Sequence, residues 1–260
     1  MSNIGIPSSS PIGIFEGKSI ITSVSFGSEC TYIGDNAFKD CVSLKQINDD
    51  NMIECIGNNT FKGCVSLKQS NDDDSSVDNN STEKIPILNF NNLTSLGESA
   101  FECCESLENV SMDKCFTISP STFKDCKSLS HINIPNCTKI GSSAFYDCEN
   151  LSDIYLDNCT KIGSAAFENC LSLSKITLNK CEEIDSRAFY GCKNLSEVHI
   201  NTPRSSDGLP YCKLVNIDAF ANIDNIRFYI PAEIIEAYRH GLNWGAYVNQ
   251  IQPLQNYHYN

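Results

Sequence analysis

Basic residues are scarce in this sequence and form no cluster. Lys and Arg number 19 against 32 Asp and Glu, which gives a formal net charge of -13 and a pI near 4.7. Nucleic acids and anionic membranes are held chiefly by clustered Lys and Arg. The composition therefore excludes both as principal partners, and we expect the partners to be other proteins.

Long apolar runs and a secretory start are also missing. No stretch of about 18 consecutive apolar residues occurs, so we expect no ordinary transmembrane helix and no membrane insertion. The start, MSNIGIPSSSPIGIFEGKSI, has no basic segment followed by about seven or more apolar residues, as a signal peptide would have. We therefore expect a cytoplasmic protein, whose 15 cysteines would be free thiols.

Residue patterns for chemistry are scarce as well. The sequence has only 4 histidines, and His131 and His199 fall in separate copies of the repeat described below. No C-x-x-C pair occurs, although zinc sites usually present two thiolates in that way. The segment GIFEGKS, residues 13–19, differs from a phosphate-binding loop in having three residues between its glycines instead of four. We therefore expect no enzyme, no catalytic residue, no cofactor and no metal.

What the sequence does have is a repeat of 22 residues. Each full copy reads approximately I-G-x-x-A-F-x-x-C-x-x-L-x-x-I-x-(I/L)-x-x-C-x-x-I. A unit of this size cannot bury its apolar side alone, so the copies must stack. The phenylalanine of the pattern marks about nine coils: Phe15, Phe38, Phe61, Phe101, Phe123, Phe145, Phe167, Phe189 and Phe220.

Two segments of each copy have a recognisable local pattern. The segment L-x-x-I-x-L ends in alternating apolar and polar residues, which predicts a strand with one buried face. The segment I-G-x-x-A-F-x-x-C has apolar residues three to five apart and predicts a short helical turn. The domains we expect are an N-terminal tail over 1–14, a solenoid over 15–230 with loop insertions at 70–90 and 201–213, and a C-terminal cap over 231–260.

The expected cap has the signals of a helix. Pro231 suits a first helical turn, Ile234, Ile235 and Tyr238 share one face, and Gly241 follows as a stop. Trp244 and Tyr247 would supply the large apolar area needed to close the last coil.

The repeat resembles the leucine-rich repeats, L-x-x-L-x-L-x-x-(N/C)-x-L. More narrowly, I-G-x-x-A-F-x-x-C followed by L-x-x-I-x-I-P, intact at residues 129–135, is similar to the BspA-type repeats, and YIPAEIIEAYRHGLNW is similar to the segment that often follows them. The resemblance implies an α/β solenoid: a right-handed leucine-rich-repeat coil with a parallel sheet on one face, short helical turns and loops opposite, and a helical C-terminal cap. It also implies binding of host or neighbouring-cell proteins.

The repeat places cysteine in two slots of each coil, where we expect buried structural thiols. Sulfur would there act as a soft acceptor for backbone N–H groups that lose their partners at a turn. Metal binding and regulated disulfides stay open as alternatives, and we expect Cys103 and Cys212 to be the most exposed thiols. The expected buried thiols are Cys126, Cys137, Cys148, Cys159, Cys170, Cys181 and Cys192.

The outward side chains of the predicted strands form two rows that could bind a partner, or could be an ordinary solvated surface. Only Tyr155 is an aromatic residue of the kind that dominates interfaces. The first row is Asn109, His131, Asp153, Lys175 and Glu197, and the second is Ser111, Asn133, Tyr155, Thr177 and His199.

These features predict a non-enzymatic protein–protein interaction or scaffold module. One version is a spacer within a large intracellular assembly, cytoskeletal or ciliary. The alternative that the family resemblance implies is a cell-surface or secreted adhesin.

Overall fold

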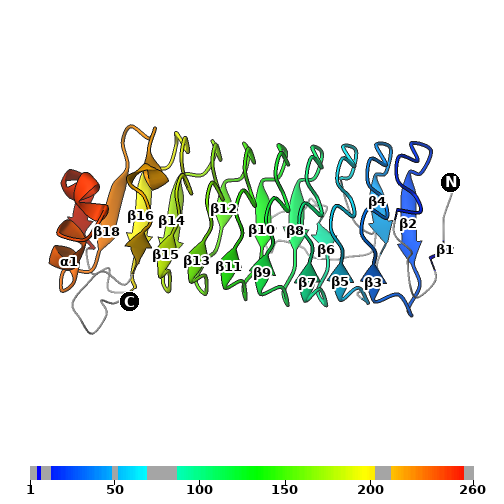
Figure 1. Ribbon diagram of the computed structural model, residues 1–260, viewed down its shortest axis with the longest axis horizontal. Helices are drawn as coiled ribbons and strands as arrows, with labels where there is room; N and C mark the ends of the chain where they lie inside the picture. The colour runs from blue at the N-terminus through cyan, green and yellow to red at the C-terminus, as the bar shows by residue number, and fades with distance from the viewer. Residues whose placement is uncertain (1–4, 7–12, 49–51, 69–86, 203–211, 255–260) are drawn as a thin grey trace, which may run out of the picture.

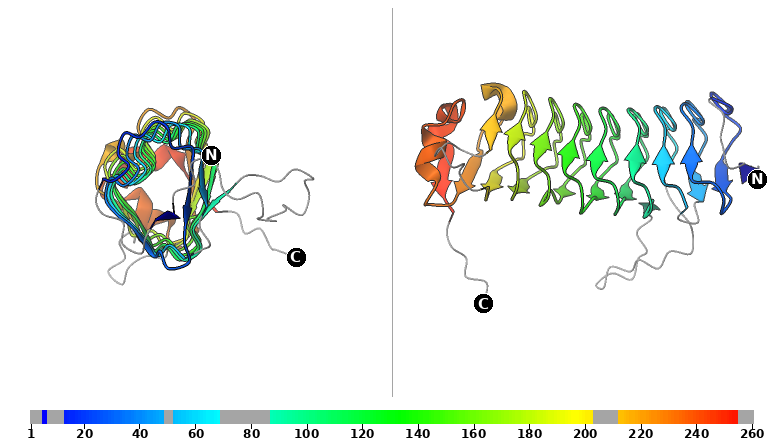
Figure 2. Two further views of the ribbon diagram at one scale, coloured as in Figure 1. Left: turned by 90° about the vertical axis from the view of Figure 1, so that its right-hand side faces the viewer. Right: turned by 60° about the horizontal axis from the view of Figure 1, so that its bottom comes forward.

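The computed structural model describes residues 5–6, 13–48, 52–68, 87–202 and 212–254. These residues form a straight stack of similar coils, with the N-terminal coil at one end and the helices of the C-terminal segment at the other (Figure 1). Viewed along the stack, the coils superpose around one closed ring (Figure 2). The expected tail 1–14 and both insertions lie largely outside the described residues.

Parallel strands line two sides of each coil, where we expected a sheet on one face only. The second column arises at the two residues that end in the last isoleucine or leucine of each repeat, such as Lys139–Ile140, which are extended and pair with the next coil. The first column holds β1 (Gly5–Ile6), β2 (Ser23–Phe26), β4 (Gln46–Asn48), β6 (Leu88–Asn89), β8 (Asn109–Ser111), β10 (His131–Asn133), β12 (Asp153–Ile154), β14 (Lys175–Leu178), β16 (Glu197–Ile200), β18 (Arg227–Ile230) and β19 (Ile251–Pro253). The second holds β3 (Tyr32–Ile33), β5 (Cys55–Ile56), β7 (Ser95–Leu96), β9 (Thr117–Ile118), β11 (Lys139–Ile140), β13 (Lys161–Ile162), β15 (Glu183–Ile184) and β17 (Lys213–Leu214).

The phenylalanines form a continuous stack of rings through the core. Phe145 is fully buried, and its ring centroid lies 5.5 Å from that of Phe123 and 5.2 Å from that of Phe167, with nearly parallel planes. The same stacking joins successive rings from Phe15 to Phe220 at 5.0 to 5.5 Å. The apolar period of the sequence thus becomes one core that runs the length of the stack.

The turn that carries each phenylalanine is not the helical turn that we expected. Ser143 and Asp147, on either side of Phe145, have left-handed backbones with φ of 53° and 55°. With these two residues left-handed, the N–H groups of residues 143, 145 and 147 point to the next coil and donate to its carbonyls at 2.8 to 2.9 Å. The N–H groups of residues 144 and 146 still donate within the turn, to carbonyls three residues back, so hydrogen bonds between coils have replaced only every second bond of a helical turn. Among the described coils, the last turn differs and contains the 3-10 helix η1 (Ile217–Phe220).

Close approach of neighbouring coils explains the glycine that follows the second-column strand in several coils, such as Gly97 after β7. A Cβ atom on Gly97 would lie 2.4 Å from the carbonyl carbon of Gly57 and 2.5 Å from the nitrogen of Asn58. We expect Gly97→Ala to lower the free energy of unfolding by about 1–3 kcal/mol, because the added Cβ can be accommodated only if the two coils move apart at this point. Urea denaturation measures the loss. The matched control is Gly27→Ala, whose Cβ would have nothing within 4 Å; equal stability of the two variants would contradict this explanation.

The C-terminal segment bonds to the last coil as another coil would. It contains α1 (Ile235–Arg239), the 3-10 helix η2 (Trp244–Gln250) and β19, which pairs with β18. In the second column, each coil donates N–H groups to the preceding coil, as Lys213 does to the Glu182 carbonyl. The corresponding carbonyls of the last coil, those of Cys212 and Leu214, accept instead from Trp244 Nε1 at 2.7 Å and Asn243 Nδ2 at 2.8 Å.

The same segment also covers the last phenylalanine turn. Elsewhere the phenylalanine N–H donates to the next coil, as Phe189 does to the Ala219 carbonyl at 2.8 Å. The N–H of Phe220 donates instead to the Tyr247 hydroxyl at 3.3 Å, and that hydroxyl donates to the Ile217 carbonyl. Polar side chains of the terminal segment thus supply partners that a further coil would have supplied with its backbone.

Candidate functional site

The pairing of the first-column strands brings the first predicted row together. His131 lies beside Asn109 on one side and Asp153 on the other, and Lys175 lies beside Glu197. His131 Nε2 is 3.4 Å from Asp153 Oδ2, and Lys175 Nζ is 3.5 Å from Glu197 Oε2. Within the row, Lys175 and Glu197 pair opposite charges, whereas Asp153 lies beside an imidazole. We call the outward side of the first column the strand face.

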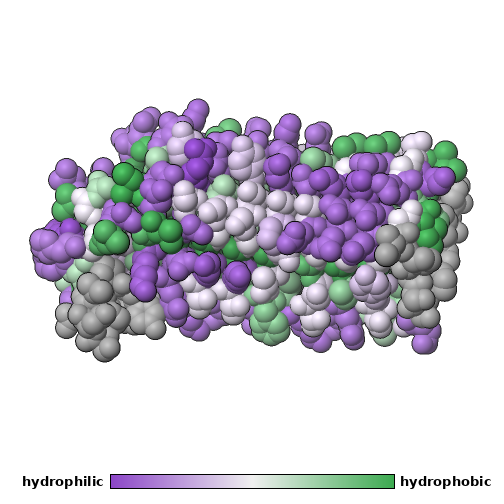
Figure 3. All heavy atoms as spheres, in the orientation of Figure 1, coloured by the Kyte–Doolittle hydropathy of each residue, from purple (hydrophilic) through white to green (hydrophobic). Residues whose placement is uncertain are grey.

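The second predicted row lies parallel to the first and contains the most exposed aromatic residue of the face. Asn133 lies beside Ser111, and Thr177 lies beside His199. Tyr155 is 73 % exposed. Hydrophilic residues predominate on the side of the molecule seen in Figure 3 and are interspersed with hydrophobic ones.

The structure extends both rows by residues that the sequence pattern missed. Arg227 lies beside Glu197, and Tyr229 lies beside His199, with 4.7 Å between the His199 and Tyr229 ring centroids. The alternating apolar and polar residues of Arg227–Ile230 were the available signal. The gap of 31 residues between Phe189 and Phe220 hid their register.

Several row residues are less exposed than we expected. Asn109 is in register with His131 and lines a hollow together with it and Ile87, but it is only 6 % exposed. It therefore offers little surface to a partner. Four other members of the rows are half-buried: Ser111, Thr177, Glu197 and His199.

Two hollows lie in the strand face on either side of Tyr155. The larger, of about 420 Å³, extends from Ile87 across β8 and β10 to Tyr155. The smaller, of about 190 Å³, lies between the Tyr155 coil and the next, and Lys175 and Thr177 line its far side. Nearby, the His199 ring that contacts Glu197 holds the pKa of that carboxyl below its ordinary value. The strand face thus offers concave surface around one projecting aromatic ring.

The cysteines of the two slots are buried, and their sulfur atoms lie close to backbone carbonyls. In one slot Cys148 Sγ is 3.0 Å from the Phe123 carbonyl of the preceding coil. In the other, Cys159 Sγ is 3.3 Å from the Lys161 carbonyl. The thiols therefore act as donors, whereas we expected sulfur acceptors. All seven cysteines of the predicted set, Cys126, Cys137, Cys148, Cys159, Cys170, Cys181 and Cys192, are at most 1 % exposed.

The expectation for the two most exposed thiols is half right. Cys103 is half-buried, as is Cys55, but Cys212 is fully buried. The Trp244 indole that bonds the Cys212 carbonyl lies over this part of the last coil. The C-terminal segment therefore covers Cys212, which we expected to be exposed because it lies in the predicted insertion 201–213.

Burial predicts unreactive thiols and a loss of stability at alkaline pH. Burial raises the pKa of Cys137 to about 11 from 9.0, and that of Cys192 to about 12. The folded protein therefore holds these protons more tightly than the unfolded chain. Their contribution to stability is full below pH 9 and is lost as the pH rises through about 11 for Cys137 and about 12 for Cys192. We expect the unfolding free energy, measured in urea, to fall across this range.

Alkylation followed by peptide mass spectrometry tests the same burial residue by residue. We expect iodoacetamide to modify Cys148 and Cys159 only after unfolding, because a protonated, buried thiol is a poor nucleophile. The half-buried Cys103 is the internal comparison. Native-state labelling of Cys148 as fast as in urea would contradict the prediction.

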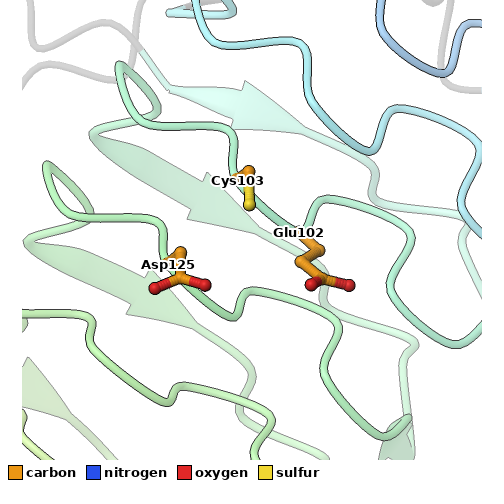
Figure 4. A group of neighbouring side chains, drawn as sticks. All are labelled: Glu102, Cys103 and Asp125. Carbon is orange, nitrogen blue, oxygen red and sulfur yellow. The ribbon is translucent and has the colours of Figure 1, made fainter.

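One group of side chains has the donor atoms of a cation site, namely Glu102, Cys103 and Asp125 (Figure 4). Glu102 already accepts from Lys62 at 2.8 Å, and Lys124 lies 3.8 Å away. Burial, with nearby Asp125, raises the pKa of the Cys103 thiol and keeps it protonated. The two lysines supply the positive charge that a metal ion would bring, so the group is a salt-bridge cluster between coils.

Comparison with known proteins identifies the family of the chain. The sequence profile of the BspA type leucine rich repeat region (6 copies) matches residues 9–114, 73–157 and 116–237. The chain belongs to this family of leucine-rich repeat proteins, and the resemblance drawn from its sequence is confirmed. None of the curated proteins matches the chain.

Solved structures of leucine-rich repeat proteins are similar to this chain at low sequence identity. A leucine rich cell surface protein from Faecalibacterium prausnitzii is 20% identical with a TM-score of 0.51, and the alignment covers 98% of this chain and 88% of that one. A leucine-rich repeat protein from T. pallidum is 22% identical with a TM-score of 0.46, covering 78% of each chain. Among the described residues, no helix is long and apolar enough to cross a membrane.

Proposed function

We propose that this repeat protein binds other proteins through the strand face around Tyr155. The observation that carries the proposal is the 73 % exposed Tyr155 ring between two hollows of the strand face. Tyrosine is enriched in interface hot spots, because its ring buries a large area and its hydroxyl keeps a polar partner.

For the place of action, we propose the cell surface or the secreted space, with an adhesin-like role. One support is that the F. prausnitzii protein of the same fold is described as a cell surface protein. The other is that the free thiols are buried and protonated, and are therefore protected from oxidants. Free cysteines are thus compatible with an oxidising location outside the cell. A cytoskeletal or ciliary role has only the general usefulness of rigid repeats as spacers in its favour.

Affinity capture from the native cell tests the binding face. We expect the wild-type chain to retain at least one protein that Tyr155→Ala loses and that Tyr155→Phe retains in part. Phe116→Ala is the matched control, because Phe116 is 56 % exposed but lies beside the second column. Capture of the same proteins by wild type and Tyr155→Ala would show that the face is not used.

Surface biotinylation of intact cells tests the location independently. We expect the protein to be labelled before lysis while a cytoplasmic marker is not. Labelling only after lysis would remove the adhesin role and leave an intracellular binding protein.

A further inference from the structure

The first-column sheet is interrupted beside Tyr155. β12 pairs with β10, but it ends one sheet, and β14 begins another. The same two coils stay joined elsewhere, because β13 pairs with β15 and the Phe145 N–H donates to the Ala166 carbonyl at 2.8 Å. The interruption is therefore local to the strand face.

The interruption makes the coil of Tyr155 different from its neighbours on the face. β12 has 2 residues, whereas β10 has 3 and β14 has 4. Tyr155 follows directly after β12, and the smaller hollow lies in the interruption itself. Tyr155 therefore projects at the place where the sheet is open, with concave surface on both sides.

The two hollows differ in chemistry. The larger one has an apolar side chain at each end, Ile87 and Tyr155, and between them it passes over the strands of the buried Val110 and Ile132. The polar residues of its lining are Asn89, Asn109, Ser111, His131, Asn133 and Asp153. Its volume of about 420 Å³ is at the small end of the range for ligand pockets. It suits one large apolar side chain of a partner. The smaller hollow has Asp153, Asp157 and Lys175 around it.

The carboxylates around Tyr155 have no strong cationic partner. Within the described part of the chain, Asp113, Asp153 and Asp157 have no lysine or arginine nitrogen within 4.0 Å. Lys175 pairs with Glu197, and the Asp153 carboxylate has the imidazole of His131 and the Ser152 hydroxyl as its partners. The Asp157 carboxylate accepts from the neutral amide of Asn179 at 2.6 Å. This part of the face can therefore attract a cation.

We propose that the partner contributes an extended protein segment with one large apolar residue and a lysine or arginine two or three positions away. The apolar side chain fills the larger hollow against Tyr155, and the cationic side chain pairs with Asp153 or Asp157. Asp153 lines the larger hollow together with Tyr155, and Asp157 lies two residues beyond Tyr155 in the same coil. Side chains two or three positions apart in an extended segment are ~7–10 Å apart, so one can fill the hollow while the other pairs with a neighbouring carboxylate. The proposal rests on the proposed function, because it specifies the chemistry recognised by the same face.

A random short-peptide display library selected on the full chain, with Tyr155→Ala as counter-selection, tests this chemistry. We expect the enriched peptides to share an apolar residue and a Lys or Arg at that spacing. Synthetic peptides of the consensus should lose about tenfold or more in affinity on Tyr155→Ala, as hot-spot residues do. Asp153→Asn with Asp157→Asn should weaken binding severalfold and reduce its dependence on salt, because the lost attraction is electrostatic.

Two control variants and the possible failures separate this proposal from the proposed function. Phe116→Ala and Glu149→Gln, both exposed and away from the hollows, should leave peptide affinity unchanged. Two results would overturn the partner chemistry but still support the binding face. One is peptides that need Tyr155 but contain no basic residue; the other is peptides whose affinity does not change on Asp153→Asn with Asp157→Asn. The absence of any Tyr155-dependent peptide also overturns it, while Tyr155-dependent capture from cells would still support the proposed function.

Discussion

Phe145→Ala is expected to lower the free energy of unfolding by about 3–5 kcal/mol, the cost of emptying a buried aromatic site. The Phe145 ring is fully buried and lies between two stacked neighbours, Phe123 and Phe167. Its removal leaves a cavity that the turn cannot close, because the residue-145 N–H and its neighbours are bonded to the next coil. The lost ring contacts and the residual cavity both contribute to the cost.

Urea denaturation followed by circular dichroism measures this loss. Phe145→Leu, which keeps apolar volume but not the stacked ring, should fall between wild type and Phe145→Ala. Phe116→Ala, which removes a 56 % exposed ring, should change stability by less than ~0.5 kcal/mol, as surface substitutions usually do. A loss below about 1 kcal/mol for Phe145→Ala would mean that the ring stack is not the centre of the core.

Trp244→Ala is expected to cost about 3–5 kcal/mol and to loosen the C-terminal end of the stack first. Trp244 is fully buried, and its ring contacts those of Phe228 and Tyr238. It also donates to the Cys212 carbonyl at 2.7 Å. The substitution therefore removes both apolar packing and a hydrogen bond from the last coil.

Trp244→Phe separates the two contributions. It keeps most of the apolar packing but leaves the Cys212 carbonyl without its donor, which should account for about 1–3 kcal/mol. Hydrogen exchange should show faster opening of residues 212–230 than of the central coils in both variants, because repeat arrays unfold from their ends. Uniform exchange along the stack, or no loss in Trp244→Phe, would contradict the role assigned to the indole N–H.

The sequence could predict the core and much of the face because both follow from a period. Residues separated by 22 positions, such as Phe123 and Phe145, must occupy equal places in successive coils when the units stack. The same register places Asn133 beside Ser111 and Asp153 beside His131. Where the period is interrupted before Phe220, the register was lost, and Tyr229 was missed although its strand has the right alternation.

The phenylalanine turn shows why local pattern was a weaker guide. Apolar residues three to five apart suit a helix, and nothing in the type of Ser143 announces a left-handed backbone. That conformation is stabilised by hydrogen bonds to the next coil, which become possible only after the coils have stacked. At Ser143, contacts between coils overrode local propensity. Two residues after the phenylalanine the sequence did contain a signal, because Gly63, Asp147 and Asn169 are of types that tolerate a left-handed backbone.

The sequence by itself determined that this protein is a stack of repeats with a phenylalanine and thiol core, because a periodic apolar pattern can be buried only by regular stacking. Only the tertiary structure decided where the sheet is interrupted beside Tyr155, that Asn109 is buried, and that Trp244, Asn243 and Tyr247 replace a further coil. These features depend on how one coil meets the next. A pattern that describes the average coil does not contain that information.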